Sequence, residues 1–258
     1  MSSQNCAGLD ADPLLEEFQY PTMFGEAEVF ALETDEGVPV RVLYVAGGFQ
    51  SATFLGERRF DPVFEYYRAI DCVFDARPSA RRLLMIGGGA FSYPKHLLMS
   101  EEERLEGASI DVVEIDPAIV DIARAHFFLD EVERAHGPEG SGRLSVVVGD
   151  GAEVLRCAQA GRYDVIVNDS FSGTDPTDGL LSAELLDAAR SVLTPGGLYV
   201  VNAVAETLEE AEPFACSLRR AFARVYLLPC PDEEFDGSSN NLLLASDEPI
   251  ELPGLTKL

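Results

Sequence analysis

Three acidic side chains follow apolar segments of the kind that form buried strands: Glu114, Asp150 and Asp169. Another apolar segment, residues 82–86, runs directly into three glycines at residues 87–89. Glycine lets the backbone turn tightly and lets a ligand approach the main chain closely. In an open parallel sheet, ligands bind beyond the carboxyl ends of the strands, so these groups would gather at one edge. The combination predicts a site for a nucleoside.

Each acid has a chemistry that suits one part of a nucleoside. Glu114 could accept hydrogen bonds from both ribose hydroxyls, and the pair Asp150-Gly151 suits an adenine amino group beside closely packed backbone. A dinucleotide-dependent enzyme would share the glycines and Glu114 but would not need that pair. Taken singly, each acid could also be a solvated group or a helix cap, and the glycines could form a turn without a ligand.

The chain from residue 82 onward alternates strand and helix patterns. Repeated β-α units predict a parallel, doubly wound α/β sheet. The last two strands are joined without a helix and should pair antiparallel. The result is a mostly parallel sheet of seven strands, expected at residues 82–86, 110–114, 144–148, 164–168, 198–204, 225–228 and 241–245.

The part of the chain before the glycines predicts a small antiparallel sheet of hairpins followed by a helix at residues 62–74. We therefore expect three regions along the chain. They are a tail at residues 1–27, a β-hairpin region with its connecting helix at residues 28–76, and a nucleoside-binding domain at residues 77–258.

Composition bears on partners and location. The formal charge of 19 − 45 = −26 repels nucleic-acid phosphates and anionic membranes, so we expect neither as a partner. The five cysteines form no C-x-x-C pair and the three histidines no H-x-x-x-H pair, so we expect no metal. Without a signal-peptide pattern or an apolar stretch of spanning length, the sequence predicts a cytoplasmic protein.

Four motifs resemble those of the polyamine aminopropyltransferases, the spermidine synthases. They are Gly87-Gly88-Gly89, Val113-Glu114-Ile115-Asp116, Gly149-Asp150-Gly151, and Tyr163-Asp164-Val165-Ile166 with Asp169-Ser170. The resemblance extends over residues 28–246 and is closer to a divergent branch of that family. It implies a class I methyltransferase fold with an N-terminal β-hairpin domain. It also implies a homodimer, and a donor substrate that is S-adenosylmethionine or its decarboxylated form.

The resemblance also implies roles for individual residues. Asp169 would be the catalytic base, and Tyr66, Ser170 and Ser172 would lie on the acceptor side. The segment 169–182 matches the family's gatekeeping loop in length, and its composition disfavours helix and strand. The donor would be bound by Gln50, Gly87, Gly88, Gly89, Glu114, Ile115, Asp150, Gly151 and Asp169.

Three positions depart from the family pattern. Ala90 replaces an aspartate that holds the donor's amine, Ser172 replaces an acid that binds the acceptor amine, and Arg68 replaces a glutamate and would repel a diamine. Three functions therefore stay open. The first is a spermidine-synthase-like transferase acting on a small-molecule acceptor, with amines among the candidates. The others are a small-molecule methyltransferase, and a nucleoside-binding regulatory or interaction protein without turnover.

Overall fold

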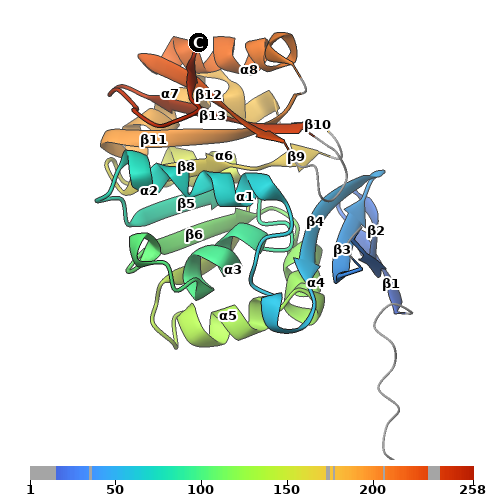
Figure 1. The fold of residues 1–258 in the computed structure, drawn as a ribbon. Helices are drawn as coiled ribbons and strands as arrows, with labels where there is room; N and C mark the ends of the chain where they lie inside the picture. Colours follow the sequence, from blue (N-terminus) through green and yellow to red (C-terminus); the bar gives the residue numbers. More distant parts are fainter. Residues whose placement is uncertain (1–15, 35–36, 173–174, 177, 206, 232–238) are drawn as a thin grey trace, which may run out of the picture.

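The computed structural model describes residues 16–258 except 35–36, 173–174, 177, 206 and 232–238, and these residues form two main sheets and a separate pair of two-residue strands (Figure 1). The smaller sheet is antiparallel and pairs its four strands in chain order. These strands are β1 (Glu17–Thr22), β2 (Gly25–Glu33), β3 (Pro39–Val45) and β4 (Gly48–Phe54).

The larger sheet has the strand order β14-β12-β13-β11-β8-β5-β6-β7. Strand β5 pairs in parallel with β6 on one side and with β8 on the other, so the winding direction reverses at β5. The crevice beyond the carboxyl ends at such a reversal is where open α/β sheets bind ligands. The strands are β5 (Arg82–Ile86), β6 (Ser109–Glu114), β7 (Leu144–Val148), β8 (Tyr163–Asn168), β11 (Leu193–Val204), β12 (Arg224–Pro231), β13 (Ser239–Ser246) and β14 (Thr256–Lys257).

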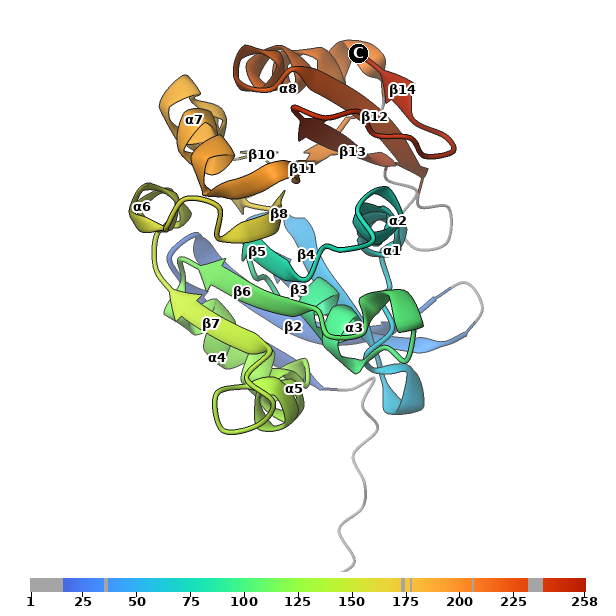
Figure 2. The same ribbon diagram turned by 90° about the vertical axis from the view of Figure 1, so that its left-hand side faces the viewer.

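Helices cover both faces of this sheet (Figure 2). One face packs against α1 (Glu65–Ile70), α2 (Cys72–Ala76), α3 (Ser92–Met99) and α5 (Leu129–His136). The other packs against α6 (Gly151–Cys157), α7 (Ala183–Val192) and α8 (Leu208–Ala221). Strand β5 contributes alternate residues to the two cores, Leu83 and Met85 to one and Leu84 and Ile86 to the other, as the period of a pleated strand requires.

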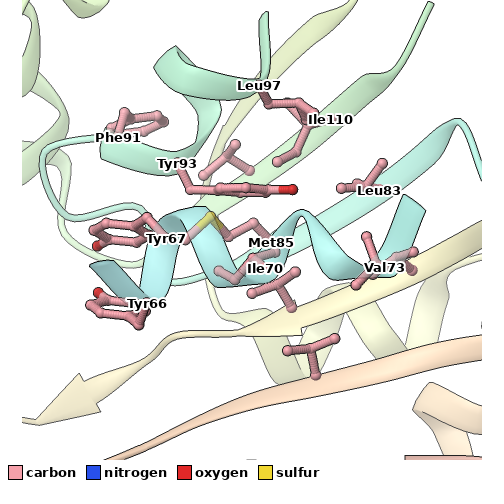
Figure 3. Close-up of a cluster of buried hydrophobic side chains, with 14 of the residues drawn as sticks. Tyr66, Tyr67, Ile70, Val73, Leu83, Met85, Phe91, Tyr93, Leu97 and Ile110 are labelled. Atoms are coloured by element: carbon pink, nitrogen blue, oxygen red, sulfur yellow. The ribbon is translucent and has the colours of Figure 1, made fainter. Parts of the chain in front are cut away.

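The helices α1 and α3 share their core with strand β5. Tyr67 and Ile70 of α1 pack with Met85 of β5 and Tyr93 of α3 (Figure 3), and all four side chains are buried. The tyrosines of α1 are therefore fixed by the same core that supports the glycine turn after β5.

Helix α4 (Pro117–His126) joins the two sheets. A third apolar cluster packs side chains of β2 and β3, such as Val29 and Leu43, against Ile119 and Ile122 of α4. In the same region the Tyr20 hydroxyl of β1 lies 2.6 Å from Nε2 of His126. The small sheet is thus attached beside the strand ends of the large one.

The fold class predicted from the sequence is confirmed, with corrections to single elements. All seven predicted strands are present, and β12 and β13 pair antiparallel as expected. The short strand β14 adds an eighth by pairing with β12. The expected helix at residues 62–74 is divided into α1 and α2 at Asp71, whose carboxylate is buried against His96.

Two segments expected to lack regular structure contain strands. The expected tail includes β1 and the start of β2, because Phe18 and Tyr20 pack on His126 of α4. The loop 169–182 contains the two-residue strands β9 (Phe171–Ser172) and β10 (Asp175–Pro176), which pair with each other, and a short 3-10 helix, η4 (Asp178–Leu181). The proposed domain boundaries themselves stay a prediction. In the described part of the chain no helix is long and apolar enough to cross a membrane.

Lys95 provides a test of the packing between the two sheets. Its ammonium group is buried and donates to the Phe127 carbonyl at 2.8 Å and to Thr53 Oγ1 at 3.3 Å. Burial lowers the pKa of Lys95 to about 7, from 10.5 in the unfolded chain. Below pH 7 the buried group is charged, and this charge destabilises the folded state. The destabilisation decreases as the pH rises from 7 toward 10.5. Lys95→Met should raise the free energy of unfolding on the order of a few kcal/mol near pH 6, and by less near pH 9.

Urea unfolding of both proteins at the two pH values measures this difference. An equal gain in the free energy of unfolding at pH 6 and pH 9 would contradict the lowered pKa of Lys95. Lys257→Met, at an exposed lysine of β14, is the matched control and should change little at either pH.

Candidate functional site

A cavity of about 820 Å³ lies between the small sheet, α1 and the carboxyl ends of the central strands. This volume is in the range of small-molecule sites. Most of the predicted site residues line it: Gln50, Tyr66, Gly87, Gly89, Glu114, Ile115, Asp150, Gly151, Asp169 and Ser170. The structure brings these residues together, and their individual roles stay predictions.

Two glycines are required by close approach of neighbouring chain segments. Gly87 has φ +93°, and a Cβ there would lie 2.3 Å from the carbonyl oxygen of Asp169. A Cβ on Gly151 would lie 2.3 Å from Cγ2 of Ile86. Because real Cβ atoms do not come so close to other heavy atoms, a larger residue at either position would push apart the strand ends that form the cavity floor.

The Glu114 carboxylate fixes the shape of the glycine turn. Its Oε2 accepts hydrogen bonds from the backbone N–H of Gly88 at 2.9 Å and of Gly89 at 3.1 Å, and its Oε1 accepts one from Asp116 N at 3.0 Å. The side chain is buried yet lines the cavity. Glu114 therefore shapes the turn and still has acceptor capacity on Oε1 for a ligand hydroxyl.

Asp150 lies at the next strand end and caps α6. Its Oδ1 accepts from Ala152 N at 2.8 Å, and the side chain is exposed. The cap fixes the carboxylate beside Gly151, and both residues line the cavity. Ile115 is 42% exposed and lines the same part of the cavity, where an apolar ligand surface would cover it.

Asp169 is a carboxylate enclosed by hydrogen-bond donors at the root of the loop after β8. Its Oδ1 accepts from Asn202 Nδ2 at 2.8 Å, and its Oδ2 from the Tyr66 hydroxyl at 3.2 Å. Burial raises the pKa of Asp169 to about 6, against the opposing hydrogen bonds from Asn202, Tyr67 and Tyr66. Such a carboxyl is mostly ionised at neutral pH and accepts a proton more readily than an ordinary aspartate, as a general base requires.

Sequence reasoning did not assign Tyr67 and Asn202 to this site. Tyr67 lies against Tyr66 with 4.1 Å between the ring centroids, and both line the cavity. Asn202 is level with Asp169, because Val201 of β11 pairs with Asn168 of β8. Asn202 lies inside β11, two residues before the strand ends at Val204, so it is not one of the strand-end residues from which the site was predicted.

The structure also changes how the three departures from the family pattern are understood. Arg68 is not one of the residues that line the cavity: its side chain is 40% exposed and pairs with Glu65 at 3.6 Å, so its contact with an acceptor is not supported. Ala90 is fully buried in the apolar cluster around Ile119. The side chain of Ser172 lies outside the described residues. Ser170 lines the cavity and donates from Oγ to Asn168 Oδ1 at 2.7 Å.

Comparison with known proteins agrees with this geometry. Residues 67–231, more than half of the chain, match the spermine/spermidine synthase domain. The chain belongs to this family. It is 35% identical over 127 residues to putrescine N-methyltransferase 1 of Nicotiana tabacum, covering 49% of this chain and 31% of that protein. It is 27% identical over 164 residues to spermidine synthase of Coffea arabica, covering 60% of this chain and 49% of that protein.

This chain therefore spans less than half the length of these curated relatives. Among solved structures it is similar to a probable spermidine synthase from Corynebacterium glutamicum ATCC 13032. The TM-score is 0.70 at 21% identity, and the match covers 92% of this chain and 82% of that one. At this identity the similarity establishes the fold.

Glu114 gives the most direct test of the nucleoside end of the cavity. Glu114→Ala should weaken the binding of methylthioadenosine roughly tenfold or more, because a charge-assisted hydrogen bond contributes about 1.5–3 kcal/mol. It should also lower the melting temperature, since three backbone N–H groups lose their acceptor. Calorimetric titration and a thermal melt measure the two effects.

Asp121→Ala is the matched control, because Asp121 is an exposed acid of the adjoining helix α4 whose carboxylate pairs with Arg124 at 3.3 Å. It should change neither quantity. If Glu114→Ala binds methylthioadenosine as tightly as the wild type, Glu114 does not bind the ribose. If its melting temperature is unchanged, Glu114 does not stabilise the glycine turn.

Proposed function

We propose that this protein is a transferase that binds S-adenosylmethionine, or its decarboxylated form, and transfers an alkyl group to a small-molecule amine. The proposal is carried by one observation: an ionisable carboxylate, Asp169, lies in the same cavity as the nucleoside-type groups Glu114 and Asp150. The spermidine synthases and putrescine N-methyltransferases among its relatives support an amine as the acceptor.

The chemistry follows from the donor's charge. The positive sulfur makes its adjacent carbon electrophilic, and the cavity would hold the amine in line with that carbon. As the N–C bond forms, the C–S bond breaks and its electron pair stays on sulfur as a neutral thioether. The proton lost by the amine passes to the Asp169 carboxylate. Because the sulfonium is itself the electrophile, we propose a transfer that needs no metal.

The residues around Asp169 would keep its carboxylate directed at the amine. Asn202 and Tyr66 each bond a different carboxylate oxygen, so the group cannot rotate without losing one of them. Both side chains are buried, which limits their own movement. The backbone N–H of Asp169 also donates to Ile86 O at 2.8 Å, which ties the base to the strand that precedes the glycines.

A methyl group from S-adenosylmethionine is the second form of this proposal. A decarboxylated donor carries a terminal amine that needs an acid, and Ala90 provides only a buried methyl group at the family position. A nucleoside-binding regulatory protein without turnover is the remaining alternative.

A cytoplasmic location and a homodimer are proposed as well: β1 and β4 are the edge strands of the small sheet, and such edges can pair with a second subunit. A monomeric mass in light scattering would refute the dimer.

Asp169→Asn should preserve the fold and donor affinity while lowering the single-turnover rate by roughly 10²–10⁴-fold, the range of general acid–base groups. The amide has the shape of the carboxylate but cannot take up the proton. Because the pKa of Asp169 is raised in the folded state, its charge lowers stability above about pH 6. Removing that charge should therefore not lower the melting temperature near pH 8. A normal rate with reduced stability would exclude Asp169 from the chemistry.

Putrescine with the decarboxylated donor should be a poor substrate pair despite the family relationship. An amine left without a partner in a cleft loses several kcal/mol of compensation. Mass spectrometry of the products, with each donor offered against the same panel of amines, measures the preference. Efficient spermidine formation would contradict it and would assign the donor's amine to other acids. Ala90→Asp should not restore aminopropyl transfer, because it would place a carboxylate in an apolar cluster and destabilise the fold.

A further inference from the structure

The turn between β1 and β2 places an aromatic ring in the cavity. Phe24 lines the cavity although it lies in the segment expected to be a tail, and its side chain is 36% exposed. Its neighbour Met23 is 62% exposed and is not among the lining residues. The two side chains of one turn therefore differ: one faces the cavity and the other does not.

A buried carboxylate anchors this turn to the nucleoside end of the cavity. Asp116 Oδ2 accepts a hydrogen bond from Met23 N at 2.6 Å, and its Oδ1 accepts one from Ala118 N at 2.9 Å at the start of α4. Only 1% of Asp116 is exposed, so both bonds are shielded from water. Since Asp116 directly follows Ile115 and its own N–H donates to Glu114, the turn is fixed beside the groups assigned to the ribose.

We infer that Phe24 is a donor-binding residue whose ring packs on the nucleoside part of the donor, with Ile115 as the second apolar surface at that end. The inference rests on the proposed function, because it needs an adenosyl donor in this cavity. Large apolar side chains left accessible at a cavity are commonly covered by a ligand. An aromatic face can stack on the flat nucleobase of the donor. The strength of such stacking depends little on the rest of the ligand.

The contact predicts a particular dependence on ligand structure. Methylthioadenosine and S-adenosylhomocysteine share the adenosyl group and differ in the chain on sulfur. If Phe24 contacts the nucleoside, Phe24→Ala should weaken both ligands by the same factor, roughly tenfold, as stacking losses on alanine substitution indicate. A contact with the sulfur substituent would instead weaken one ligand much more than the other.

The chain contains no tryptophan, so a single indole can report on the contact directly. Phe24→Trp should show a change in emission when methylthioadenosine is titrated, because the indole would lie against the bound nucleoside. Met23→Trp is the matched control: it changes the neighbouring residue of the same turn, whose side chain does not line the cavity. Its emission should stay constant over the same titration.

The outcomes separate this inference from the proposed function. If the wild-type protein binds methylthioadenosine by calorimetry but Phe24→Ala binds it equally well and Phe24→Trp shows no response, the inference is wrong and the proposed function stands. Equal responses from both tryptophan variants would also overturn it, since the signal would then come from movement of the turn as a whole. If the wild-type protein binds neither ligand, the proposed function itself fails.

Discussion

The close approach of Gly87 to Asp169 is the constraint on which the rest of the site depends. The carbonyl of Asp169 occupies the space that a side chain at position 87 would need, and Asp169 N bonds Ile86 O at 2.8 Å. These contacts join the ends of β5 and β8 at the point where the sheet reverses its winding. The glycine turn and the candidate base are therefore positioned by the same backbone contact, and neither can move without the other.

The small sheet completes the site from the other side of the glycine turn. Ser51 Oγ of β4 accepts from Ala90 N at 3.0 Å, and Ser92 donates to Ala52 O at 3.2 Å. Together with the bonds from Glu114, these contacts fix both sides of the turn. Since the β1–β2 turn is bonded to Asp116, the small sheet forms part of the binding cavity rather than a separate appendage.

Seven strands of the large sheet and the acids at their ends could be predicted because both follow from simple periodicity and topology. Glu114, Asp150 and Asp169 line one cavity, as parallel strand ends require. Phe24 was not predictable in the same way. It lies in the short turn between β1 and β2, and its role depends on a hydrogen bond from that turn to a carboxylate 93 residues further along the chain.

Arg68 shows a second limit of sequence reasoning. Its position next to Tyr66 and Tyr67 suggested a cation in the cavity, but a helix directs consecutive side chains about a quarter-turn apart. The two tyrosines face Asp169, and Arg68 turns toward Glu65 instead. Which face of a short helix a residue occupies depends on the tertiary packing that Tyr93 and Met85 impose, and six residues of α1 contain too little periodicity to show it.

The proposed chemistry requires that the buried carboxylate at the end of β8 has a pKa raised toward neutrality and serves as the base. The most direct measurement is the pKa of Asp169, followed by carbon-13 NMR of labelled aspartate carboxyls and assigned by the resonance that is missing in Asp169→Asn. We expect a pKa of about 6, raised by burial. A value near the ordinary aspartate pKa of about 3.9 would show that water reaches the carboxylate and would contradict the claim.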